Sequence, residues 1–162
     1  MDKMMHDKMK EISLFAEIKD SRESMEKLEA LVKIRRYARD EIILREGDCG
    51  GEMFIVYKGN VEIRKKTRAG DDYTVARLSA DQNVFFGELS LIDDDMRSAT
   101  VVATSDCECL AIAKSDFLSL GRRCPDIALP ITQAIARMLA ARMRKTTQDM
   151  LALFDALVNE VG

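Results

Sequence analysis

Phe86-Gly87-Glu88-Leu89-Ser90-Leu91 is followed shortly afterwards by Arg97-Ser98-Ala99-Thr100, and together the two runs indicate a binding loop. Gly87 allows the backbone to come close to a ligand, because glycine has no Cβ. The amides of Glu88, Leu89 and Ser90 are expected at the start of a short helical turn, where free N–H groups favour an anion. Arg97 can donate two parallel hydrogen bonds to phosphate oxygens.

Glu88 is unexpected in an anion site, because a carboxylate repels a phosphate. Its presence is explained if it accepts a hydrogen bond from a neutral hydroxyl, such as a ribose 2′-OH. A phosphate and a ribose hydroxyl within one loop indicate a nucleotide. The alternative is a hairpin in which Glu88 and Arg97 pair across two strands. The run Asp93-Asp94-Asp95 between the two halves is interpreted as a solvated turn whose charge weakens anion binding.

These residues resemble the phosphate-binding cassette of the cyclic nucleotide-binding domain family, which includes protein kinase A regulatory subunits, cyclic-nucleotide-gated channels and bacterial catabolite activator proteins. The family pattern reads Phe-Gly-Glu-Leu-Ala-Leu, a short loop, and then Pro-Arg-Ala-Ala-Thr-Val. Gly87, Glu88 and Arg97 match it in register. The departures are Ser90, Met96 and Ser98, of which Ser90 and Met96 remove no charged or backbone contact. The resemblance implies that cAMP or cGMP is the ligand and that there is no cofactor.

From residue 34 to residue 113 the sequence consists of short β-rich runs broken by glycine and aspartate, which is typical of an all-β region. The predicted strands are Ile34–Tyr37, Glu41–Leu44, Met53–Lys58, Asn60–Lys66, Asp72–Ser79, Ser98–Ala103 and Cys107–Ala113. Asp40 and Asn83 stand where the family commonly has glycine, and both residue types tolerate positive φ. We therefore expect an α+β chain: N-terminal helices over 1–32, an eight-stranded, jelly-roll-like β-barrel over 33–117, and C-terminal helices over 118–162.

Two helices are predicted before the barrel. Met5, Met9 and Ile12 lie three or four residues apart, as on one helical face. This stripe is interpreted as core packing, with a partner-binding helix as the alternative. Ser21 is a predicted cap for a second helix. The apolar face of that helix comprises Met25, Leu28, Leu31 and Val32.

By resemblance, Ile63 and Val75 align with the strand positions that line the purine. Strand alternation would place them on inward faces with Val61 and Tyr73 respectively. The alternative for each is plain barrel core.

The C-terminal helix is expected to start near Pro125, with Pro130 in its first turn or at a kink. In the family this helix closes over the base. Arg142 stands where catabolite activator proteins have a residue that reads adenine, and its guanidinium could stack on the purine. The alternatives are an exposed Arg142, an Arg142 paired with a nearby acid, or Arg137 in its place.

Apolar residues recur along this helix at helical spacing. They are Ile131, Ile135, Met138, Leu139, Met143, Met150, Leu153, Leu157 and Val161. The stripe is wider than one barrel edge covers, so we expect a homodimer through this helix. The alternative is that Met150–Val161 folds back on its own chain.

The charge and composition of the chain argue against several classes of function. A net charge of −3 argues against nucleic acid, and no apolar run approaches the roughly 20 residues that span a membrane. The four cysteines, Cys49, Cys107, Cys109 and Cys124, lack metal-ligand spacing, which favours reduced thiols in a cytoplasm. Cys107 and Cys109 are expected to be buried free thiols. Because His6 is the only histidine, no catalytic pairing is available, and we expect no enzyme.

The sequence thus predicts a cytoplasmic regulatory module that binds a cyclic nucleotide, cAMP before cGMP, and couples binding to its C-terminal helices and a protein effector. One alternative is the sensory domain of a catabolite-activator-type transcription regulator without its DNA-binding part, since Thr147–Gly162 is too short for a helix-turn-helix. Another is a roll with a non-nucleotide ligand.

Overall fold

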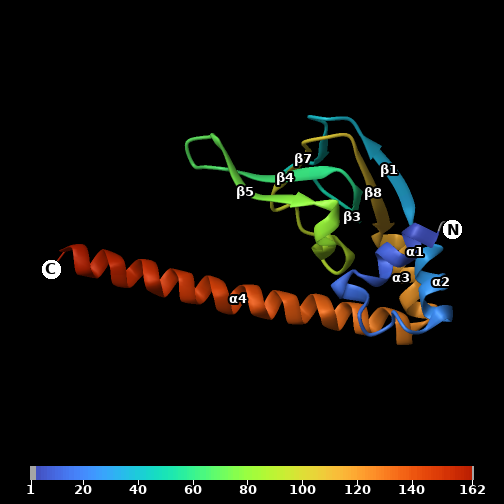
Figure 1. Cartoon of the computed structure of the whole chain (residues 1–162). Coiled ribbons are helices and arrows are strands. Elements are labelled where there is room, and N and C mark those ends of the chain that lie inside the picture. The colour runs from blue at the N-terminus through green and yellow to red at the C-terminus, as the bar shows by residue number, and fades with distance from the viewer. Residues whose placement is uncertain (1–2, 162) are drawn as a thin grey trace.

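The centre of the chain is a β-roll, with helices packed at one end and a long helix running past it (Figure 1). The structure, a computed structural model, describes the backbone of residues 3–161 and the side chains of residues 3–158. Within this part of the chain, eight strands form two antiparallel four-stranded sheets, ordered β1-β8-β3-β6 and β2-β7-β4-β5. The predicted α+β class and jelly-roll-like barrel are confirmed.

The strands are β1 (Lys33–Tyr37), β2 (Ile42–Leu44), β3 (Glu52–Lys58), β4 (Asn60–Lys66), β5 (Asp72–Ser79), β6 (Phe85–Phe86), β7 (Thr100–Ala103) and β8 (Cys107–Ala113). The helices are α1 (Lys3–Lys10), α2 (Arg22–Glu29), α3 (Lys114–Arg123) and α4 (Pro125–Val161). Three short 3-10 turns complete the chain: η1 (Ser13–Phe15), η2 (Ala80–Gln82) and η3 (Glu88–Leu91).

Each predicted strand is present, with ends that differ by at most two residues. The strand that sequence analysis missed is β6, which pairs with Phe54 and Ile55 of β3. Two residues are too few to show alternation, so only this pairing identifies it. Asp40 and Asn83 have φ of 67° and 54°, which confirms the expectation that these turns adopt positive φ.

Two apolar clusters hold the fold together. The first lies between the two sheets, where the rings of Phe54 and Phe86 stack with centroids 5.4 Å apart. Cys107 and Cys109 are buried in this cluster as free thiols, as predicted, and burial raises the pKa of Cys109 to about 12. The second cluster joins the first sheet to the N-terminal helices, α3 and the first part of α4.

The N-terminal stripe is core packing, because Met9 and Ile12 are fully buried in the second cluster. The predicted cap on α2 is present: Ser21 Oγ accepts from the Ser24 N–H at 3.2 Å. Leu31 and Val32 follow the end of α2, although they still pack against the core.

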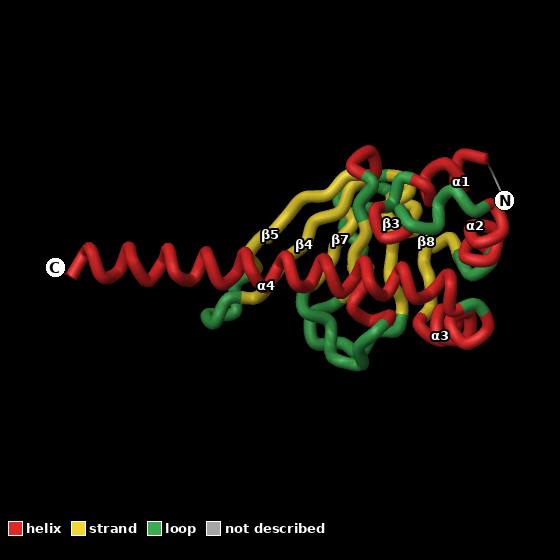
Figure 2. Tube along the Cα trace, turned by 90° about the horizontal axis from the view of Figure 1, so that it is seen from below, coloured by secondary structure: helices red, strands yellow, loops and turns green. Residues whose placement is uncertain are grey.

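The long helix α4 is packed at its start and exposed along the rest of its length. Pro130 lies inside it, and Ile131 and Ile135 are buried in the second cluster, where α4 packs against α3 and η1. Every side chain from residue 141 to residue 158 is exposed, and the helix projects away from the roll (Figures 1 and 2). The alternative in which Met150–Val161 folds back on its own chain is therefore wrong for this structure, and the side chain of Val161 lies outside the described residues. Within residues 3–161, no helix is both long and apolar enough to cross a membrane.

Candidate functional site

The binding loop forms where β6 ends. Gly87 adopts φ +72°, and η3 follows directly from it. A Cβ at position 87 would lie 2.8 Å from Arg97 Nη1, so a larger residue would both strain the backbone and displace the arginine. Gly87 is thus required by the approach of Arg97 as well as by the turn.

One of the three expected amides is used inside the loop. The Ser90 N–H donates to the Gly87 carbonyl oxygen at 3.2 Å, which closes the turn. The Ser90 hydroxyl is buried and donates to the same carbonyl at 2.7 Å. In this conformation the Ser90 amide is therefore already bonded, to the carbonyl of the residue before η3, and its role in binding an anion stays a prediction.

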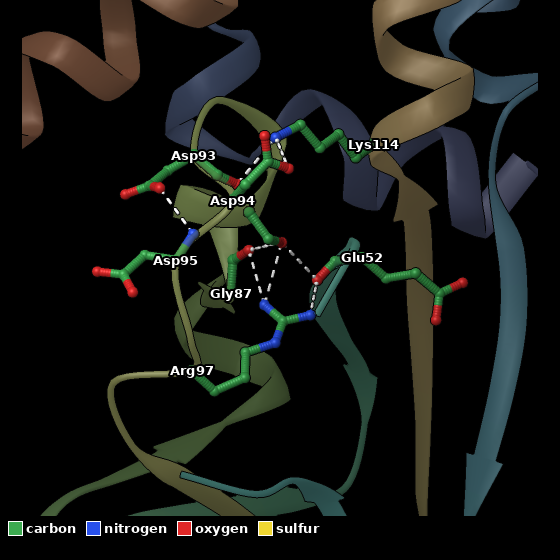
Figure 3. Close-up of polar contacts among 8 residues, drawn as sticks. Glu52, Gly87, Asp93, Asp94, Asp95, Arg97 and Lys114 are labelled. Atoms are coloured by element: carbon green, nitrogen blue, oxygen red, sulfur yellow. Dashed lines mark hydrogen bonds and ion pairs between the residues drawn. The ribbon is translucent and has the colours of Figure 1, made fainter. Parts of the chain in front are cut away.

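Arg97 points into the loop and is held there by neutral oxygens (Figure 3). Its Nη2 donates to the Glu52 carbonyl at 2.6 Å, and its Nη1 donates to Ser90 Oγ at 3.0 Å and to the Gly87 carbonyl at 3.3 Å. Its Nε is buried without a hydrogen-bond partner. Burial lowers the pKa of Arg97, an effect that the charges of Glu52 and Glu88 only partly oppose.

Glu52, on β3 beside Arg97, turns its carboxylate away from the guanidinium. Glu52 contacts Arg97 through its backbone oxygen, while its carboxylate points to the other side of the strand and pairs with Arg35 at 2.9 Å (Figure 3). Among residues 3–158, no carboxylate forms an ion pair with Arg97. A partly buried cation without an anionic partner is an arrangement that an anionic ligand would complete.

The β2–β3 loop lies directly against Arg97. The Arg97 N–H donates to the Asp48 carbonyl and its carbonyl accepts from the Gly47 N–H, both at 2.9 Å. A Cβ at Gly50 would lie 1.9 Å from Arg97 Nε. The sequence pattern does not reveal this contact of Gly50 with Arg97, because it is set by tertiary packing.

Arg97 lines a cavity of about 270 Å³ that opens beside the β2–β3 loop. Its apolar wall is formed by Tyr37, Ile43, Leu44 and Phe54, and its rim by Arg45, Asp48, Cys49, Gly50, Gly51 and Glu52. The predicted purine walls, Ile63 and Val75, are not among these residues. Ile63 packs with Val61 in the cluster between the sheets.

Val75 is 53% exposed, and its neighbour Tyr73 is also exposed. They are not barrel core, because the β4–β5 register shifts after Ile63 and the hairpin continues beyond the roll (Figure 1). Ser98 is exposed and Ala99 is half-buried beyond Arg97. The ligand-binding roles of these residues stay predictions.

Glu88 and Arg142 meet in the structure. The Glu88 side chain is only 5% exposed, and its Oε1 lies 2.9 Å from Arg142 Nη1. The structure therefore adopts the alternative in which Arg142 pairs with a nearby acid, and stacking on a purine stays a prediction. Arg137 is paired with Glu17 instead.

Among the described residues, no three His, Cys, Asp or Glu side chains are grouped so as to hold a metal ion.

Comparison with known proteins identifies the domain. The sequence profile described as "Cyclic nucleotide-binding domain" matches residues 34–124, which is more than half of the chain. The cyclic AMP receptor protein of Thermus thermophilus is 34% identical over 129 residues, covering 79% of this chain and 57% of that protein. The cAMP-dependent protein kinase regulatory subunit of Mycosarcoma maydis is 34% identical over 93 residues, 56% of this chain and 17% of that protein.

Solved structures agree with the sequence comparison. The catabolite activator protein of Thermus thermophilus superposes with a TM-score of 0.76 at 30% identity, covering 87% of this chain and 62% of that one. The N-terminal domain of a transcriptional regulator from Streptomyces coelicolor gives 0.74 at 29% identity, covering 89% and 95%. This chain thus spans little more than half the length of the first relative. It belongs to the cyclic nucleotide-binding domain family.

Proposed function

We propose that this chain is a non-catalytic regulatory module that binds a cyclic purine nucleotide, cAMP in preference to cGMP, and transmits binding through α4. The observation that carries the proposal is Arg97, a half-buried guanidinium held by three neutral oxygens and lacking a carboxylate partner. A singly charged cyclic phosphate would supply the missing anion through charge-assisted hydrogen bonds. Relatives named for cAMP and relatives named for cGMP both support a cyclic nucleotide as the ligand.

Glu88 is assigned to the ribose 2′-OH, and in the free chain Arg142 occupies its Oε1. A bound nucleotide therefore has to share the Glu88 carboxylate with Arg142 or displace Arg142 from it. Because Arg142 belongs to α4, the ligand would bind the states of the helix with different affinity, which is the condition for shifting their populations. Released from Glu88, Arg142 would be available to cover the base beside Ile63 and Val75.

The direct test is calorimetric titration of nucleotide-free protein with cAMP and cGMP, using adenosine 5′-monophosphate as the control. Carried-over nucleotide is first excluded by ultraviolet absorbance. We expect saturable binding of the cyclic nucleotides, with cAMP tighter, and much weaker binding of the control. Absence of heat and of a thermal shift with either cyclic nucleotide would exclude the proposal. Tighter cGMP binding would reverse only the preference, for which the Ser98 hydroxyl is the obvious cause.

A second candidate is the sensory part of a transcription regulator. Its support is the similarity to the N-terminal domain of the Streptomyces regulator, 95% of which is covered. In that case we expect that this chain alone does not bind DNA and acts in the cytoplasm on a further domain or a protein effector. An electrophoretic mobility shift with mixed-sequence duplex DNA tests the first point, because retardation of the duplex by this chain contradicts it.

A further inference from the structure

Lys114, the first residue of α3, contacts the two loops that flank Arg97. Its backbone N–H donates to the Gly51 carbonyl at 2.7 Å, which fixes the β2–β3 loop beside the guanidinium. Its ammonium group donates to the Asp93 carbonyl at 2.9 Å and lies 2.7 Å from Asp94 Oδ1 (Figure 3). A single residue therefore contacts the loop on each side of Arg97.

The Lys114 ammonium group forms these contacts and is largely shielded from water. The Lys114 side chain is 17% exposed, although a lysine normally keeps its charge in solvent. The Asp94 side chain is 96% exposed. Ordering a lysine side chain has a substantial entropic cost, so this placement needs favourable contacts to offset it.

The loop between η3 and Arg97 is also held by its own carboxylates and by the backbone bridge between Met96 and Cys49 of the β2–β3 loop. Asp93 Oδ1 accepts from the Asp95 N–H, and Asp95 Oδ1 accepts from the Met96 N–H, both at 2.8 Å. Asp94 is the acid of this run that is paired with a cation. The conformation that leads into Arg97 thus depends on these two internal bonds, on the pairing with the β2–β3 loop and on Lys114.

We propose that Lys114 is a positioning residue for the anion site, which offsets the charge of Asp93-Asp94-Asp95 and holds the loop that presents Arg97. This inference rests on the proposed function. Three uncompensated carboxylates beside an anion site repel the ligand, and the ammonium reduces that repulsion by pairing with one of them, Asp94. The same contacts join the loop to α3, which packs against α4.

The test compares Lys114→Met with Lys114→Arg, with and without Asp94→Asn, by calorimetric titration with cAMP. Lys19→Met, at an exposed position, makes the same change in net charge and is the control. We expect Lys114→Met to weaken binding roughly two- to fivefold, because Asp94 is solvent-screened, and more at low salt. Arginine at position 114 should restore affinity, and Asp94→Asn should restore part of it in the Lys114→Met background. Unchanged affinity in Lys114→Met at low salt, or a loss in Lys114→Arg equal to that in Lys114→Met, overturns the proposal.

Amide hydrogen exchange of nucleotide-free protein separates this inference from the proposed function. Lys114→Met should accelerate exchange at Asp95, Met96 and Arg97, whereas Lys114→Arg and Lys19→Met should not. If the original protein bound no cyclic nucleotide, the proposed function would fail, and this exchange pattern alone would decide the role of Lys114. Identical exchange in Lys114→Met and the original protein would overturn it.

Discussion

Arg142 Nη1 lies 2.9 Å from Glu88 Oε1, so α4 is joined to the binding loop through the same carboxylate that is assigned to the ribose. The two partners differ in exposure: the Arg142 side chain is 58% exposed, while that of Glu88 is buried. The pair is therefore open to exchange, since water can solvate the arginine when a ligand hydroxyl takes its place.

Arg142→Ala should lower cAMP affinity by roughly 1–2 kcal/mol if the guanidinium covers the base after it leaves Glu88. Arg142→Lys separates the two roles, because lysine can pair with Glu88 but lacks the planar group that stacks. Titration of both variants, with hydrogen exchange of α4, is the measurement. Equal or higher affinity in Arg142→Ala, with unchanged protection of the helix, would limit Arg142 to its pairing with Glu88 in the free chain.

Arg97→Ala should weaken nucleotide binding by about 2–5 kcal/mol, the range for truncating one partner of a desolvated charge pair. Arg97→Lys should lose less, because it keeps the charge but not the two parallel donors. Thermal unfolding without nucleotide should show little destabilisation in Arg97→Met, since a half-buried cation with an unpaired Nε is removed. Wild-type affinity in Arg97→Ala would move the anion site elsewhere.

Gly50→Ala should impair nucleotide binding although it replaces no side chain that is proposed to bind the ligand. The added Cβ would lie 1.9 Å from Arg97 Nε, so the guanidinium must move out of its present position. Gly51→Ala is the matched control, because nothing lies within 4 Å of its added Cβ. Titration of both variants should show a loss only in Gly50→Ala. Equal affinities would mean that Arg97 binds its ligand from a different rotamer.

The lowered pKa of Glu62 predicts how the stability of the fold depends on pH. Hydrogen bonds from Thr74, Arg64 and Arg77 lower the pKa of this carboxyl from 4.5 to about 2. A folded-state pKa below the unfolded value stabilises the fold while the group is ionised, and this contribution disappears as pH falls from about 4.5 to about 2. Glu62→Gln should therefore lower Tm at neutral pH and by progressively less toward pH 2. Glu11→Gln, at an exposed position, is the control, and a pH-independent difference for Glu62→Gln would contradict the assignment.

The exposed part of α4 should pair with a second copy. Met143, Met150 and Leu157 recur every seven residues and are all exposed in the single chain, as in the seam of a coiled coil. Sedimentation at micromolar concentration should show a dimer that Leu157→Asp dissociates. Gln148→Asp adds the same charge on the opposite face of the helix and should leave the dimer intact. A species with the mass of one chain, with and without nucleotide, would exclude the dimer.

The parts of the site that sequence analysis predicted are those in which residue type alone is informative. Gly87 with positive φ and Arg97 turned into the loop follow from a local pattern, and the turns at Asp40 and Asn83 follow from their residue types. The pairing of Glu88 with Arg142 joins residues 54 positions apart and depends on where α4 crosses the roll. Packing between elements also determines three further features. They are the close approach of Arg97 to Gly50, the pairing of the short β6 and the exposure of Val75.

The free length of α4 turns a small local change into a large displacement. From Arg142 to the end of the helix the chain rises about 28 Å, at 1.5 Å per residue. If the helix pivots as a rigid rod by about 10° when Arg142 leaves Glu88, its far end moves by roughly 5 Å, close to the pitch of one helical turn. Under the proposed function, a lever of this length would convert the loss of a single hydrogen-bonded contact into a shift large enough to change which side chains meet at the tip.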